Sequence, residues 1–134
     1  RPQSIRMILA DTDILIDISR RYQPSVDAIE RLRGSGALFV SVVTQMELTV
    51  GCRNAREKRA MAEILGIFRI VQISESESQL AAALIDKYFL SHGLLMPDAL
   101  IAATAVTHGY SLLTRNRRHF GFVHGLQLTA VQEQ

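Results

Sequence analysis

The chain has 134 residues, of which 48% are hydrophobic and 21% charged, and its net charge is +2 at neutral pH. This length predicts a single domain with its own core, and this composition excludes an intrinsically disordered protein. We expect no membrane segment and no secretory leader, because no uncharged stretch is long and apolar enough for either. The single cysteine, Cys52, excludes an internal disulfide and favours a reducing compartment, which we expect to be the cytoplasm.

The apolar pattern predicts strands that alternate with helices. In chain order, we expect a strand at 6–10, helices at 14–19 and 24–34, a strand at 37–41, helices at 42–48 and 61–68, a strand at 69–73, helices at 80–89 and 97–108, and strands at 111–114 and 126–128. The helix at 97–108 is apolar nearly all round, so we expect it in the interior.

Alternation of strands and helices over short connections predicts an α/β fold, with a mainly parallel sheet of four to five strands and helices on both faces. We expect one domain over residues 1–134, with 1–6 as a leader and 130–134 as a tail. In such sheets, ligands bind beyond the carboxyl ends of the strands, where the strand order reverses.

Four polar residues are predicted near this edge of the sheet. Asp11 follows the first strand, Glu47 lies on the helix after the second strand, and Asp98 lies in the first turn of the apolar helix. Asn116 follows the fourth strand. The three acids are embedded in apolar sequence, and carboxylates buried together need protons, arginines or cations. Several acids at one oxygen-rich site are typical of Mg²⁺ or Mn²⁺ sites, whereas no spacing of His and Cys indicates zinc.

Each aspartate also has a purely structural interpretation. Asp11 or Asp13 is suited to cap the helix that follows, and Asp98 complements the dipole of its own helix. Asp17 has a structural interpretation as well. Glu47 differs, because its neighbours are apolar and an unpaired buried glutamate is costly, so we expect a partner for it.

Three stretches carry a resemblance to a known family. They are LADTDILID (9–17), SVVTQMELTVG (41–51) and LLMPDALIAATAVTHGYSLLTRNRRHF (94–120). In order and spacing they resemble the PIN-domain ribonucleases, in particular the VapC-type toxins of toxin–antitoxin pairs. The resemblance implies a PIN-like three-layer α/β/α domain and a Mg²⁺- or Mn²⁺-dependent endoribonuclease that hydrolyses RNA phosphodiester bonds with cation-activated water. It also implies a homodimer inhibited by a cognate VapB-type antitoxin.

The resemblance assigns roles to particular positions of this chain. The metal-binding acids of the family fall on Asp11, Glu47 and Asp98. The fourth acidic position falls on Asn116, which completes the candidate catalytic set. The expected supporting residues are Thr12, Asp13 and Thr114. The expected RNA contacts are Arg115, Arg117 and Arg118.

Asn116 departs from the family pattern, because many members have an aspartate at this position. An amide oxygen can coordinate a cation or accept a hydrogen bond from bound water, but it brings no charge. We therefore expect one divalent ion to bind well rather than two, with Asp13 or Asn116 contributing through water.

Two other interpretations stay open. A catalytically weak or inactive PIN domain would bind RNA or a partner without cleavage, and Asn116 favours this alternative. The second takes residues 11–13 as the DxD motif of a haloacid-dehalogenase-type phosphatase, with Asp11 as the nucleophile. The apolar residues 14–16 replace the turn that this motif requires, and the phosphatase gives no role to Glu47.

Overall fold

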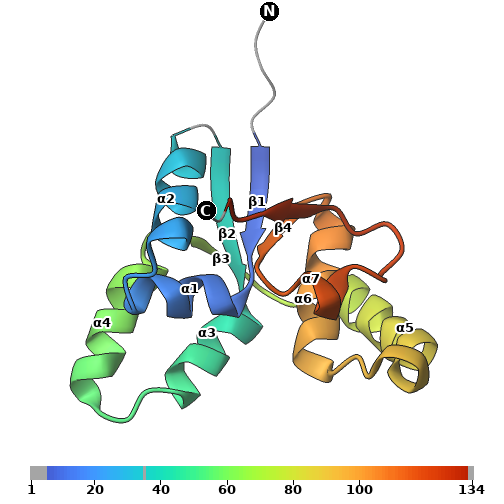
Figure 1. Ribbon diagram of the computed structural model, residues 1–134. Helices are drawn as coiled ribbons and strands as arrows, with labels where there is room; N and C mark the ends of the chain where they lie inside the picture. Colours follow the sequence, from blue (N-terminus) through green and yellow to red (C-terminus); the bar gives the residue numbers. More distant parts are fainter. Residues whose placement is uncertain (1–5, 35, 133–134) are drawn as a thin grey trace, which may run out of the picture.

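The structure, a computed structural model, describes residues 6–34 and 36–132. Over these residues the chain forms a parallel sheet of five strands with helices on both faces (Figure 1). The strands are β1 (Arg6–Ala10), β2 (Gly36–Ser41), β3 (Arg69–Val71), β4 (Ser111–Thr114) and β5 (Leu128–Ala130). The helices are α1 (Thr12–Ser19), α2 (Gln23–Arg33), α3 (Val42–Val50), α4 (Ala55–Leu65), α5 (Glu75–His92), α6 (Met96–His108) and α7 (Arg117–Phe120). The predicted α/β fold with a parallel sheet is confirmed.

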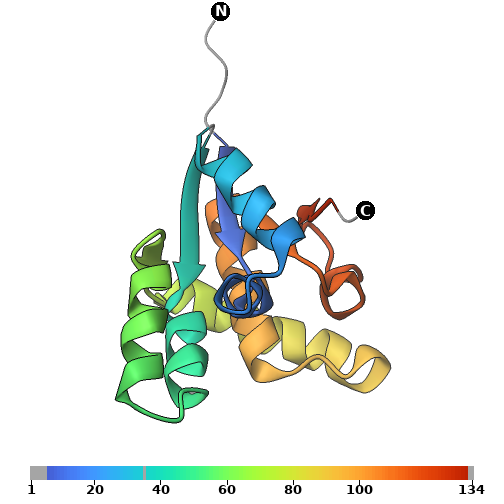
Figure 2. The ribbon, with the colours of Figure 1, turned by 60° about the vertical axis from the view of Figure 1, so that its left-hand side comes forward.

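The strand order is β3-β2-β1-β4-β5, and every neighbouring pair is parallel. Leu9 of β1 pairs with Phe39 of β2 on one side and with Leu112 of β4 on the other. The order therefore reverses between β1 and β4, and the predicted ligand site belongs at the carboxyl ends of these two strands. Figure 2 shows β1 and β2 running to the end of the sheet where α1 and α3 begin.

Four of the strands lie close to their predicted positions. β1 and β4 occupy the predicted ranges 6–10 and 111–114, β2 begins one residue before the predicted 37–41, and β3 is shorter than the predicted 69–73. Two-residue differences at strand ends are expected, because the apolar pattern does not mark where ladder pairing stops.

The last strand lies two residues later than the predicted 126–128. Gly125 has a φ of 84° and the N–H of Leu126 bonds back to the turn, so pairing with β4 begins only at Leu128. β5 consequently enters the stretch that was assigned to a tail, and Val131 after it is buried.

Several helix bounds follow from capping residues rather than from the apolar stripe. Asp11 accepts a hydrogen bond from the N–H of Thr12 and begins α1 two residues before the predicted range. Asn54 caps α4 in the same way, and a capping box of Ser74 and Glu77 begins α5. The short helix α7 was not predicted, because four residues carry no periodicity.

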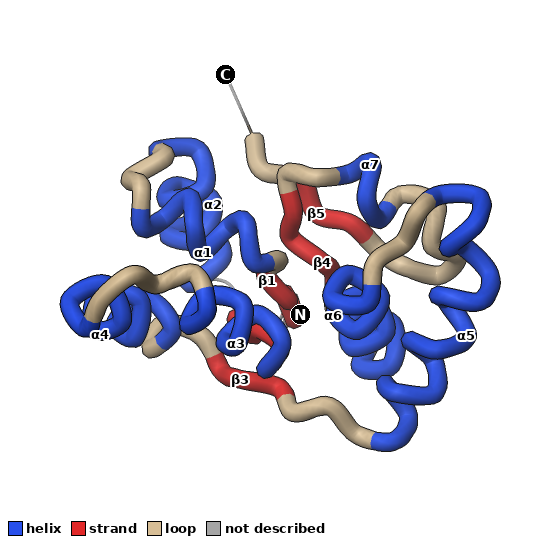
Figure 3. Tube along the Cα trace, turned by 90° about the horizontal axis from the view of Figure 1, so that it is seen from below, coloured by secondary structure: helices blue, strands red, loops and turns tan. Residues whose placement is uncertain are grey.

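Two core clusters lie on the two faces of the sheet. α5 and α6 cover one face, and α6 is the interior helix predicted at 97–108, with Ala99, Ala102 and Ala103 fully buried. α1, α2 and α4 cover the other face, where Ile29 and Leu32 of α2 are part of the core. Figure 3, viewed from below the sheet of Figure 1, shows the two groups of helices on opposite sides of the strands. The predicted three-layer arrangement is confirmed.

Arg6, the last residue of the predicted leader, is the first residue of β1. Residues 1–5 and 133–134 lie outside the described part of the chain. Cys52 is only half-buried, and its thiol donates to the carbonyl of Leu48. Within the described ranges, no helix is long and apolar enough to cross a bilayer.

Candidate active site

Asp11 lies at the reversal point of the sheet, directly after β1. Its backbone N–H donates to the carbonyl of Leu113 in β4 at 2.9 Å. Its side chain is 5% exposed, and Oδ1 accepts from the N–H of Thr12 at 2.8 Å while Oδ2 accepts from the hydroxyl of Thr114 at 2.9 Å. Both carboxylate oxygens are therefore held, one by the cap of α1 and the other by the end of β4.

Thr114 connects Asp11 to Asn116. It is buried, and its hydroxyl oxygen also accepts from the backbone N–H of Asn116 at 2.9 Å. The side-chain nitrogen of Asn116 in turn donates to Oδ2 of Asp13 at 2.9 Å. The supporting residues predicted from the sequence thus form one chain of hydrogen bonds along the β1 and β4 side of the site.

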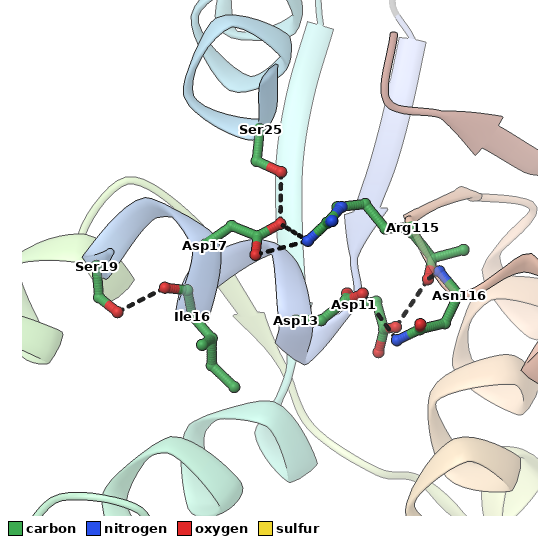
Figure 4. Close-up of polar contacts among 9 residues, drawn as sticks. Asp11, Asp13, Ile16, Asp17, Ser19, Ser25, Arg115 and Asn116 are labelled. Carbon is green, nitrogen blue, oxygen red and sulfur yellow. Dashed lines mark hydrogen bonds and ion pairs between the residues drawn. The ribbon is translucent and has the colours of Figure 1, made fainter. Parts of the chain in front are cut away.

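Asp13 lies next to Asp11 in the close-up of Figure 4. Burial and the neighbouring charge of Asp11 raise the pKa of Asp13 to about 8. Its Oδ1 is buried, with no hydrogen-bond partner. An oxygen in this condition favours either a proton or a cation beside it.

Glu47 comes from α3, on the other side of the site. The hydroxyl of Thr12 donates to its Oε1 at 2.7 Å. Since that hydroxyl has one proton, the contact of 2.9 Å between Thr12 and Thr44 is a hydrogen bond donated by Thr44. The expected partner of Glu47 is thus a threonine pair, of which Thr44 was missed in the sequence. A hydroxyl one turn before an acid on the same helix was the available signal.

The expectation that Glu47 is buried is wrong. Its side chain is exposed, and so are the neighbouring apolar residues Met46 and Val50. α3 packs through Val43 and Leu48 instead, so the apolar residues around Glu47 lie on two faces of the helix rather than one.

Asp98 lies in the first turn of α6, with its side chain 27% exposed. Burial raises its pKa to about 6, and the charges of Asp11 and Glu47 add to this effect. His119 of α7 opposes it, with Nδ1 3.8 Å from Oδ2 of Asp98. The three predicted metal-binding acids therefore lie within electrostatic reach of one another, from three separate elements.

The chemistry of these side chains fits a hard divalent cation. Carboxylate oxygens predominate, Asp13 offers an unpaired buried oxygen, and burial together with charge repulsion raises the pKa of Asp13 and of Asp98. As the side chains lie, however, no group of three or more His, Cys, Asp or Glu among the described residues is close enough to hold one ion. Shared ligation of one ion by Asp11, Glu47 and Asp98 therefore stays a prediction.

The three arginines after β4 differ in their contacts with the rest of the protein. One terminal nitrogen of Arg115 lies 3.0 Å from both carboxylate oxygens of Asp17 (Figure 4), and its guanidinium lies 4.1 Å above the ring of Tyr22. Arg117 and Arg118 are exposed on α7. Of the predicted RNA contacts, Arg115 is thus already engaged by the protein.

A three-layer α/β/α fold with acids at the reversal point of a parallel sheet is the arrangement of a PIN domain. The chain belongs to this family, whose match covers residues 8–123. The resemblance found in the sequence is confirmed.

Within the PIN-domain family, the chain is similar to two curated ribonucleases and to a chain of one solved toxin–antitoxin complex. The chain is 36% identical over 115 residues to Ribonuclease VapC10 of Mycobacterium tuberculosis, across 85% of the chain and 86% of the relative. It is 30% identical over 115 residues to Ribonuclease VapC1 of Methanocaldococcus jannaschii, across 84% of the chain and 78% of the relative. A toxin–antitoxin complex from Klebsiella pneumoniae contains a similar chain, with a TM-score of 0.75, 31% identity and coverage of 89% and 94%.

Proposed function

We propose that this protein is the toxin of a toxin–antitoxin pair and acts as an endoribonuclease that requires Mg²⁺ or Mn²⁺. The observation that carries the proposal is the electrostatic interaction of Asp98 with Asp11 and Glu47 at the reversal point of a PIN fold, where burial and then the charges of these two acids raise the pKa of Asp98. The names of the curated relatives support the same activity. A toxin that cleaves cellular RNA acts in the cytoplasm.

In this proposal Asp11, Glu47 and Asp98 hold the cation. When bound, the cation lowers the pKa of water and neutralises the charge that develops on the phosphate oxygens. Thr114 keeps Asp11 oriented through its hydroxyl, and Thr12 does the same for Glu47. Asp13 and Asn116 border the site and contribute through water.

The exposed arginines Arg117 and Arg118 bind the RNA backbone beside the site. They lie on α7, whose His119 faces Asp98, so a phosphodiester held by them reaches the acids. Contacts of this kind weaken as salt concentration rises.

A second candidate is a catalytically weak PIN domain that binds RNA or a partner. Asn116 favours it, because its amide nitrogen faces Asp13 and it adds no charge at the fourth acidic position. Under either function we expect one divalent ion to bind well rather than two.

A cognate antitoxin is the proposed protein partner. A cavity of about 760 Å³ between α1, α3 and α4 adjoins Glu47, so a segment bound there would cover the site. It is lined by both apolar and charged side chains, among them Leu48, Met61 and Arg53. This mixture suits an amphipathic segment of another chain.

A homodimer is the proposed assembly. Large exposed apolar side chains gather on α3 and around the connection of α5 to α6, two regions in contact through α3 and α6. They are Met46, Val50, Phe89, Leu90, Leu95 and Met96. Exposed apolar surface of this kind is typical of interfaces, and light scattering of the purified protein tests it.

The central test compares the wild-type chain with Asp98→Asn and Asp11→Asn. We expect growth arrest and Mn²⁺-dependent RNA cleavage from the wild type only, with RNA binding retained by the variants. The loss in cleavage should reach about 10³-fold, because a bound cation supplies several kcal/mol of transition-state stabilisation. Asp86→Asn, an exposed acid on α5, is the matched control.

Cleavage by all three chains, or by none, would contradict the nuclease. RNA binding by a wild-type chain that does not cleave would instead support the second candidate. A phosphoaspartate trapped at Asp11 would revive the phosphatase.

A further inference from the structure

Asp17 is a buried acid outside the group proposed to bind the cation. It lies on α1, one turn after Asp13, and is 7% exposed. Ser25 of α2, itself fully buried, donates its hydroxyl to Oδ2 of Asp17 at 2.6 Å. Figure 4 shows Asp17 between Ser25 and Arg115. A carboxylate buried to this degree requires such partners, because its desolvation is otherwise uncompensated.

Arg115 connects this buried acid to the candidate active site. Its side chain reaches Asp17 across 98 positions of the sequence, whereas its backbone N–H bonds to the carboxylate of Asp13 and lowers the pKa of that group. Its two neighbours in the chain, Thr114 and Asn116, bond to Asp11 and Asp13. Arg115 is thus bonded at two points. Its backbone bonds to Asp13 in the site, and its side chain bonds to Asp17 of α1.

The guanidinium is held tightly enough to act as an anchor. One of its nitrogens contacts both oxygens of Asp17 at 3.0 Å, and the ring of Tyr22 covers its face. Arg115 lies at the surface with 32% of its side chain exposed, so these contacts rather than burial hold it. An arginine in this position fixes the path of the chain after β4 rather than reaching for a phosphate.

We infer that Asp17 and Arg115 are positioning residues. Their ion pair holds the segment 114–116 against α1 and thereby sets Thr114 against Asp11 and Asn116 against Asp13. The inference rests on the proposed function, because the property that it controls is the binding of the catalytic cation. It replaces the assignment of Arg115 as an RNA contact.

The test uses the full chain and the variants Arg115→Ala, Asp17→Asn and the double variant. Mn²⁺ affinity is measured by electron paramagnetic resonance, and kcat and KM are measured on RNA. We expect each single variant to bind Mn²⁺ about 10- to 100-fold more weakly, as is usual when a residue that orients a metal ligand is lost. We expect kcat to fall and KM to change little. The double variant should be no worse than either single one, because both remove the same ion pair.

Arg115→Lys and Ile29→Val complete the set. Lysine keeps the charge and can contact Asp17, so it should recover part of the Mn²⁺ affinity. Ile29→Val removes one buried methylene from α2, leaves the side chains of the ion pair unchanged, and controls for a loss of stability alone. If Arg115→Ala does not fold, Asp17→Asn and Arg115→Lys carry the test.

Two results would overturn the positioning role of Asp17 and Arg115. A higher KM for Arg115→Ala, with a smaller salt dependence of RNA binding and unchanged Mn²⁺ affinity, would overturn the inference in favour of a phosphate contact. Unchanged Mn²⁺ affinity and kcat in Asp17→Asn would overturn it as well. In both cases a wild type that cleaves RNA leaves the proposed function standing, whereas a wild type that neither binds Mn²⁺ nor cleaves RNA would overturn both.

Discussion

The two sides of the candidate site are built differently. On the side of β1 and β4, Asp11, Asp13, Thr114 and Asn116 are joined by consecutive hydrogen bonds, and Asp11 is buried. On the helical side, Glu47 is exposed and accepts a hydrogen bond from a threonine, and the partner of Asp98 is a histidine 3.8 Å away. One side is held by consecutive hydrogen bonds, and the other side is held by fewer contacts.

Among changes that keep the three acids, the largest effect should come from removing one hydroxyl on each side. Thr114→Val removes the donor to Asp11, and Thr12→Val removes the donor to Glu47, with nearly the same change in shape. We expect Thr114→Val to lower kcat about 10- to 100-fold. Thr12→Val should cost about tenfold or less, because an exposed hydrogen bond contributes little. Single-turnover cleavage measures both, and equal losses would contradict the distinction between the sides.

Asn116→Asp would add a charge to the side of β1 and β4. Without metal, we expect this variant to melt at a lower temperature, since it loses the donor to Asp13 and places two acids together. With metal, we expect Mn²⁺ to bind about tenfold more tightly, because another carboxylate joins the site. Thermal melts in EDTA and in Mn²⁺ test both halves. A variant as stable as the wild type in EDTA would speak against the contact of Asn116 with Asp13.

The pH dependence of stability should report the burial of Asp13. Burial and the charge of Asp11 raise the pKa of Asp13 from its ordinary value of 3.8 to about 8 in the folded chain, so the folded chain binds more protons than the unfolded chain between these values. Stability should therefore fall as pH rises through this window. In EDTA, Asp13→Asn should flatten the decline of the melting temperature between about pH 5 and pH 9. The exposed Asp86→Asn serves as control, and a decline of the same slope in all three chains would exclude the effect.

The smallest effect should come from the exposed arginines. Arg117→Ala is expected to weaken RNA binding uniformly across sequences and to reduce the slope of log affinity against log salt by about one. Mn²⁺ affinity should not change, because Arg117 is exposed and His119 is the residue of α7 that lies beside Asp98. Fluorescence anisotropy at several salt concentrations measures the slope. A change in Mn²⁺ affinity instead would assign Arg117 to the site itself.

The sequence predicted the elements and the acids, but not how their side chains are held. Asp11 was predicted as a site residue because it directly follows an apolar strand. In the structure it lies where the strand order reverses between β1 and β4. Glu47 was placed on the right helix but with the wrong exposure, because α3 packs through only part of its apolar residues. The ion pair of Asp17 with Arg115 was not predictable, since its members are 98 positions apart and no local pattern links them.

Asp11 has two tasks at once, which limits how this protein can lose its activity. One oxygen of its carboxylate begins α1, and the same group is proposed to hold the cation. Asparagine caps helices as well as aspartate does, whereas alanine costs about 1 kcal/mol at such a position. Most changes at this position other than asparagine would therefore loosen the first turn of the helix together with the proposed chemistry, so an inactive variant that keeps its fold is expected to carry its substitution at Asp98 instead.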